Sequence, residues 1–95
     1  MRHAGQQSLD ELEPLLVRLR SLAGLTEKKR GVFYLRGKAF LHFHEDPAGL
    51  FADLRAADGR DFDRIAVTSE AGRLQLLGLA AERLTAGPPT ARADR

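Results

Sequence analysis

Two histidines, His42 and His44, stand two residues apart in a stretch whose alternating pattern predicts a β-strand. Side chains two apart on a strand point to the same face, with Cβ atoms about 6 to 7 Å apart. Two imidazoles at that separation can chelate one metal ion. If Asp53 lies across from His42 on the next strand, the set becomes two imidazoles and a carboxylate, which is typical of zinc and non-haem iron sites.

The same residues also allow other chemistry. A carboxylate beside His42 would raise the pKa of its imidazole and orient it for general acid–base work. No nucleophile is placed beside this pair, and the sequence has no Gly-x-Ser-x-Gly elbow or glycine-rich phosphate loop. A binding function is therefore favoured over an enzyme. The third interpretation is a cross-strand ladder of polar and aromatic side chains that contacts a ligand or a partner.

The turn at residues 46–49, Asp-Pro-Ala-Gly, sets the register of the strands on either side. Each of its residues suits its position in a type I turn. Closing the hairpin there places His42 opposite Asp53 and His44 opposite Phe51, with apolar residues on the other face. A one-residue slip would reverse both faces. The predicted binding face consists of Phe40, His42, His44, Phe51, Asp53 and Arg55.

A strand at residues 32–36 precedes this hairpin and joins it through a tight turn at Arg36-Gly37-Lys38. A two-residue loop would put Phe33 on the histidine face, whereas a three-residue loop would put Tyr34 there. Gly37 suits either loop because glycine tolerates positive φ. The register of this first strand stays open.

The remaining pattern predicts a helix on each side of the strands. Residues 8–11, SLDE, resemble a capping box with Ser8 as N-cap, and leucines continue at helical spacing to about Leu22. After a fourth strand at 62–68, Ser69 caps a helix from Glu70 to about Leu84. The apolar stripe of that helix is predicted as Leu74, Leu77, Ala81 and Leu84, broadened by Leu76 and Ala80.

These elements predict an α+β fold, with a four-stranded antiparallel sheet and two helices packed on one face, in the order α-β-β-β-β-α. Residues 1–7 are expected to form a disordered N-terminus, residues 8–85 a single domain and residues 86–95 a disordered C-terminal tail. A domain this small buries only about 60 to 65 % of its unfolded surface. The aromatic sheet face is therefore suited to a partner, and a homodimer is one candidate.

Composition narrows the function classes. The chain has 95 residues and a formal net charge of +2, and that excess lies in the two ends, which leaves the body neutral. The absence of cysteine excludes thiolate metal sites and fits a cytoplasmic location. No apolar run approaches the roughly 20 residues of a membrane span, so no membrane partner is expected.

Residues 28–38 hold the only basic run. Weak nucleic-acid binding would use Lys28, Lys29, Arg30, Arg36 and Lys38. Domains that bind nucleic acid usually carry a clustered basic surface with high overall charge. The neutral body and the acidic Asp53 on the aromatic face therefore argue against this function.

Two short strings resemble those of known domains. Residues 22–28, LAGLTEK, resemble the Leu-Pro-Gly-Val-x-Glu-Lys segment of MmcQ/YjbR-like proteins, and residues 37–40, GKAF, resemble their Gly-Lys-x-Phe strand start. This resemblance implies a small α+β domain with a CyaY-like sheet and a DNA-binding label. The chain departs from the pattern with Ala23 in place of the proline.

A second resemblance is to the small "luciferase-family" domain of unassigned activity. That domain carries a His-x-His-x-Asp string followed by an Ala-Asp pair, which matches His42, His44, Asp46 and Ala52-Asp53. Its later His-His and tryptophan-containing segment has no counterpart in this chain. The resemblance therefore implies the fold and no particular activity.

Taken together, the residues favour a small binding or self-association module that uses the open sheet face around His42 and His44. Its partner would be a second copy, an unidentified small ligand or another protein. The alternative is a histidine-centred metal or catalytic site, in which His42, His44 and Asp53 are the candidate ligands of a divalent metal. No other cofactor is expected.

Overall fold

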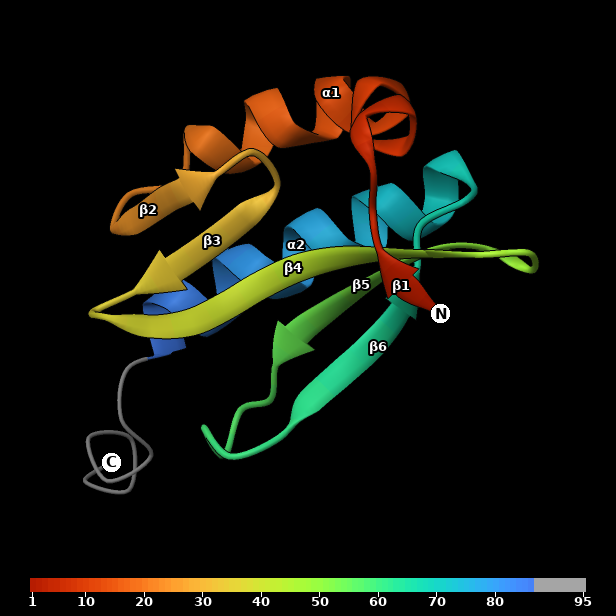
Figure 1. The fold of residues 1–95 in the computed structure, drawn as a ribbon. Helices are drawn as coiled ribbons and strands as arrows, with labels where there is room; N and C mark the ends of the chain where they lie inside the picture. The colour runs from red at the N-terminus through yellow and green to blue at the C-terminus, as the bar shows by residue number, and fades with distance from the viewer. Residues whose placement is uncertain (87–95) are drawn as a thin grey trace.

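The computed structural model of the chain describes residues 1–86 and shows two helices packed on one face of an antiparallel sheet (Figure 1). The expected α+β class is confirmed, but the sheet has six strands and not four. In chain order the elements are β1 (Arg2–His3), α1 (Gln6–Arg20), β2 (Leu25–Lys29), β3 (Val32–Leu35), β4 (Lys38–Asp46), β5 (Gly49–Arg55), β6 (Phe62–Ala66) and α2 (Glu70–Ala86). The predicted disorder at 86–95 falls, beyond Ala86, outside the described residues.

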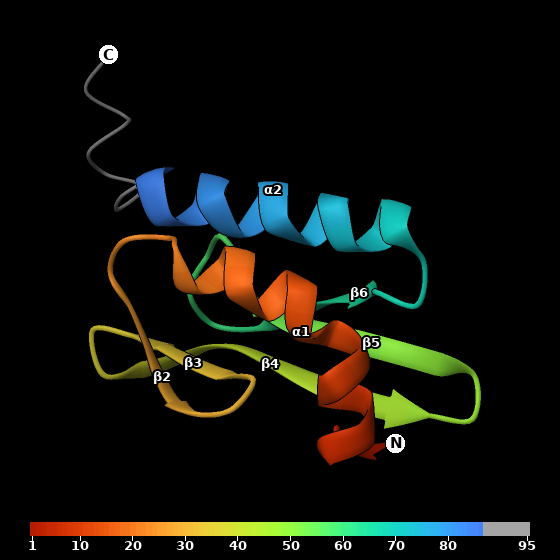
Figure 2. The same ribbon diagram turned by 90° about the horizontal axis from the view of Figure 1, so that it is seen from above.

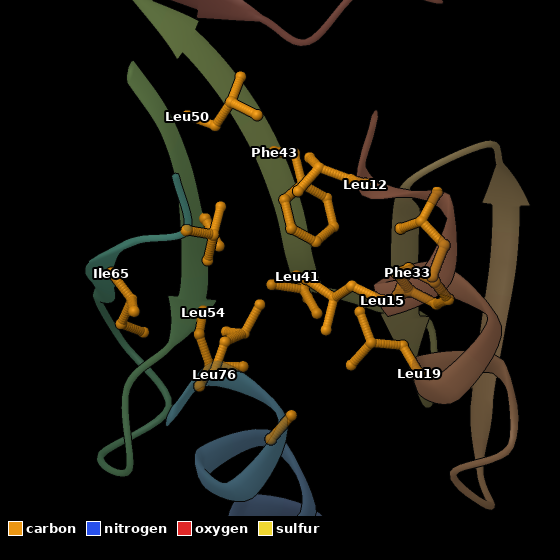
Figure 3. Close-up of a cluster of buried hydrophobic side chains, with 14 of the residues drawn as sticks. Leu12, Leu15, Leu19, Phe33, Leu41, Phe43, Leu50, Leu54, Ile65 and Leu76 are labelled. Atoms are coloured by element: carbon orange, nitrogen blue, oxygen red, sulfur yellow. The ribbon is translucent and has the colours of Figure 1, made fainter. Parts of the chain in front are cut away.

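The hydrophobic core lies between the sheet and the two helices, which run along the same side of the strands (Figure 2). Leucines of α1 pack against Phe33, Leu41 and Phe43 of the sheet, and Leu76 of α2 belongs to the same buried cluster (Figure 3). Most of the predicted stripe of α2 is confirmed, because Leu76 and Ala80 are fully buried and both Leu77 and Leu84 pack against the core. Leu74 departs from the prediction, since it is 49 % exposed. No helix in the described part of the chain is long and apolar enough to cross a membrane.

The strands follow the spatial order β2-β3-β4-β5-β6, and β1 pairs separately with β4. The predicted register of the central hairpin is confirmed, because His42 pairs with Asp53 and His44 with Phe51. Strand β6 extends this face, since Arg64 pairs with Asp53 and Phe62 with Arg55. The helices cover the opposite face, so no helix within residues 1–86 lies over this polar face.

Strand β3 joins β4 through a two-residue loop, yet Phe33 faces the core and not the histidines. Arg36 and Gly37 both have positive φ, 53° and 83°, which suits a tight hairpin. The pairing then shifts by one residue, since Tyr34 pairs with Ala39 but Phe33 pairs with Leu41. The extra residue of this β-bulge lies in β4, so Phe33 pairs with Leu41 of the core face.

The bulge also removes a residue from the predicted binding face. Phe40 is the unpaired residue between Ala39 and Leu41 in the shifted register. Its side chain is 3 % exposed and belongs to the hydrophobic core cluster. Phe40 therefore stabilises the fold and is not accessible to a ligand, contrary to the sequence prediction.

Two segments expected to lack regular structure form strands. The sequence predicts residues 26–30 as a charged connection, but Leu25–Lys29 form β2, which pairs with β3. Arg20 links this strand to α1, because it donates to Glu27 at 2.6 Å and to Glu13 at 2.7 Å. Residues 1–7, expected as a disordered N-terminus, form β1 and the beginning of α1.

Candidate metal centre

Three imidazoles meet on the polar face of the sheet. His42 and His44 come from β4, and β1 places His3 directly beside His44 in the register. One potential ligand atom from each of these histidines lies within 4.8 Å of the other two. The rings of His3 and His44 stack with centroids 4.8 Å apart, and the His42 and His44 rings meet edge to face at 4.9 Å. Figure 1 shows β1 lying against β4 at this position.

The two histidines of β4 are already in contact with each other. Nδ1 of His42 lies 3.0 Å from Nε2 of His44, and that same Nε2 lies 3.1 Å from Oδ2 of Asp53. A proton on Nε2 of His44 can therefore be donated to the carboxylate, which leaves Nδ1 of His42 as an acceptor. Burial and the nearby His44 lower the pKa of His42, which favours its neutral, metal-binding form.

Asp53 lies opposite His42 as predicted, but its carboxylate has different partners. Arg64 of β6 donates from Nε to Oδ1 and from Nη2 to Oδ2, each at 2.8 Å. The guanidinium holds the pKa of the Asp53 carboxyl below its usual range, so the carboxylate stays ionised. The predicted His42–Asp53 acid–base pair is thus replaced by an Asp53–Arg64 ion pair that also contacts His44.

The aromatic ring of Phe62, from β6, lies beside the histidines. The ring of Phe62 meets His42 edge to face, with centroids 5.2 Å apart, and the Arg55 guanidinium lies 4.7 Å over the same ring. Arg55 also donates to the carbonyl oxygens of Ala39 and Gly59. Arg55 therefore fixes Phe62 in place. The sequence prediction omitted Phe62, although the alternation of its strand already put it on this side of the sheet.

The carboxylate of Glu45 holds the segment that carries His3. Its Oε1 accepts hydrogen bonds from the Gly5 backbone N–H and the Ser8 hydroxyl, both at 2.8 Å. Its Oε2 accepts from Nε of Arg2 at 2.8 Å and forms an ion pair with Nη2 at 2.7 Å. Ser8 is thus not the N-cap of α1, which is Gly5. Glu45 of β4 therefore holds both β1 and the start of α1 against the sheet.

We expect acid to loosen β1 at an unusually low pH. The bonds from Gly5, Ser8 and Arg2 lower the pKa of Glu45 to about 2 from an ordinary 4.5. A depressed pKa means that the stabilisation is complete above pH 4.5 and is lost as the pH falls toward 2. An NMR titration of the Gly5 amide should show a midpoint near 2, and the Glu45→Gln variant should lack this transition. A midpoint near 4.5 would contradict the proposed docking.

The basic segment 28–38 is partly neutralised within the fold. Arg30 donates to Asp10 at 2.7 Å and to Glu13 at 2.8 Å, and Nζ of Lys28 lies 4.7 Å over the Tyr34 ring. Lys29, Arg36 and Lys38 are exposed. Two of the five basic residues that the sequence offers for nucleic-acid binding therefore already have partners within the fold, which weakens the case for a phosphate-binding surface.

Sequence reasoning missed one member of the cluster, His3, because its segment carries no local signal for a strand. Comparisons with protein-family models, curated proteins and solved structures gave no match to this chain. The resemblances to MmcQ/YjbR-like proteins and to the luciferase-family domain stay predictions. The three imidazoles and the side chains around them are therefore the features of this chain that indicate a function.

Proposed function

We propose that this protein is a small binding module whose open sheet face holds one divalent transition metal ion, best matched by zinc, through His3, His42 and His44. The observation that carries this proposal is the convergence of three imidazole ligand atoms within 4.8 Å of one another. The residues come from two strands, and His3 lies 39 positions before His42 in the chain. Their convergence is a product of the fold and not of local sequence.

The distances suit an ion after a small adjustment. Zinc binds imidazole nitrogen at about 2.0 to 2.1 Å, so two ligands at the tetrahedral angle lie about 3.3 Å apart. His42 and His44 already present nitrogens 3.0 Å apart from the rigid strand β4. His3 is exposed on the two-residue strand β1, so its side chain can move toward the ion with little disturbance of the core.

The donor set selects the class of metal. Neutral imidazole suits zinc, copper and nickel, whereas calcium and magnesium prefer carboxylate, carbonyl and water oxygens. Asp53, the carboxylate that contacts His44 in the described part of the chain, is bound by Arg64. The Phe62 ring beside His42 limits water on one side. These contacts support a transition metal and argue against a hard cation.

A zinc titration of the wild-type protein tests the proposal. We expect one equivalent of zinc per chain to shift the side-chain resonances of all three histidines, while magnesium at the same concentration has no effect. Light scattering on the same samples gives the mass of the species. A stoichiometry of one ion per two chains with a dimeric mass would show a site shared between copies, and absence of histidine shifts at 100-fold excess would refute the proposal.

A further inference from the structure

The three imidazoles leave one coordination position of the proposed ion unassigned. Zinc usually takes four ligands, and catalytic or ligand-exchanging sites have three from the protein and one from outside. A further donor beside the histidines is Asp53, whose Oδ2 lies 3.1 Å from Nε2 of His44. If Asp53 binds the ion the site is closed, and if it does not the site is open to an external ligand. This inference rests on the proposed metal site.

Arg64 decides between these two outcomes. Its guanidinium forms two parallel hydrogen bonds with Asp53, one to each carboxylate oxygen and both at 2.8 Å. Bidentate charge-assisted pairs of this kind are strong and directional. The two residues face each other across β5 and β6, so the backbone register holds the pair together. A metal ion would have to compete with this arginine for the carboxylate.

The charges around the site favour an anion in the open position. The three imidazoles are neutral when they bind metal, and Asp53 and Arg64 cancel each other. The ion therefore keeps its formal charge of +2 with no anionic protein ligand to offset it. His3 is exposed, which places the ion next to solvent. An anion that replaces water there removes an uncompensated charge, so its binding is favourable.

We propose that the ion held by His3, His42 and His44 binds an exchangeable small anion with an oxygen or nitrogen donor, such as a carboxylate, and that Arg64 is the positioning residue that keeps Asp53 out of this position. In this arrangement Asp53 stays paired with Arg64 outside the coordination sphere, because Nε2 of His44 has no proton left to donate to the carboxylate once it binds the ion. The proposal distinguishes an open, ligand-exchanging centre from a closed structural one.

Cobalt(II) reports on this directly, because its visible spectrum changes with its ligands. The cobalt-loaded wild-type protein is titrated with azide as the probe anion, after a separate titration has established cobalt binding. We expect a saturable spectral change with azide. Cobalt binding without any response to azide would overturn the open position while leaving the metal site in place, whereas failure to bind cobalt would overturn the metal site as well.

Two variants test the role of Arg64. In Arg64→Ala, the Asp53 carboxylate is free to bind the ion, so the apparent azide affinity should fall at least about tenfold. In the double variant Arg64→Ala with Asp53→Asn, the azide affinity should return to the wild-type value. Because Arg64→Ala leaves a buried carboxylate unpaired and could impair folding, Asp53→Asn alone is the second test. A cobalt spectrum unchanged in Asp53→Asn supports the proposal, and a changed one shows Asp53 to be a ligand. Wild-type azide affinity in folded Arg64→Ala would overturn the role of Arg64.

Discussion

Alanine at His42 is expected to weaken zinc binding about a hundredfold while the fold remains intact. Structural zinc sites contribute about 10 to 16 kcal/mol in small peptides, so each of four ligands accounts for about 3 kcal/mol, or roughly two decades in affinity. His42 lies on the polar face and is only partly buried, so its loss opens no cavity in the core. Competition with a chromophoric chelator measures the affinity, and circular dichroism checks the fold.

The matched control is Lys38→Ala, an exposed position on the same strand β4, which should bind zinc like the wild-type protein. The His3→Ala variant tests whether His3 is the third zinc ligand. If His3 is the third ligand, its removal should lower zinc affinity by a factor comparable to that of His42→Ala. Wild-type affinity in His42→Ala would refute the site, and wild-type affinity in His3→Ala alone would reduce it to the two histidines of β4.

Two glycines of α2 are expected to respond to alanine with opposite signs. A Cβ at Gly72 would clash with the backbone carbonyl oxygen of Ala66, which cannot move without displacing β6. Overpacking of this kind typically costs about 1 to 3 kcal/mol. Gly78 has no heavy atom within 4 Å of the same position, so alanine there should stabilise the helix by up to about 1 kcal/mol.

Chemical denaturation of Gly72→Ala and Gly78→Ala, measured side by side with the wild-type protein, gives both free energies of unfolding. Both substitutions add a helix-favouring alanine, so a lower stability of Gly72→Ala than of Gly78→Ala reports the contact with Ala66. Equal stabilisation by both substitutions would show that α2 does not pack this closely on β6. From the sequence, each glycine either weakens the helix or permits a close contact with a neighbouring element, and only the structure assigns the close contact to Gly72.

The residues of the central hairpin were predictable because their information is local. The Asp46 to Gly49 turn and the alternation on either side lie within a dozen residues, and together they determine which side chains oppose each other. The Ser69 cap of α2 is equally local, and its hydroxyl accepts the Gly72 N–H at 3.1 Å as expected. The α+β class and the helix-covered face follow from the same short-range patterns.

Helix α2 shows where periodicity stops being informative. It is apolar around most of its circumference, so several stripes fit the helical repeat equally well. The close approach of Gly72 to Ala66 fixes the rotation of the helix, and Leu76 is then buried while Leu74 points outward. Such an approach depends on a contact between two elements and leaves no repeat in the sequence.

By itself the sequence determined the histidine strand, its pairing with β5 and the presence of a polar sheet face. Only the tertiary structure brought His3 to that face, because the Glu45 carboxylate binds a segment about 40 residues earlier in the chain. The fold also pairs the Asp53 carboxylate with the Arg64 guanidinium. The bulge in β4 places the Phe40 side chain in the core. The physical reason is common to all three: turn and alternation preferences act over a few residues, whereas the partner of a charged or bulged residue depends on which distant strands the fold places beside it.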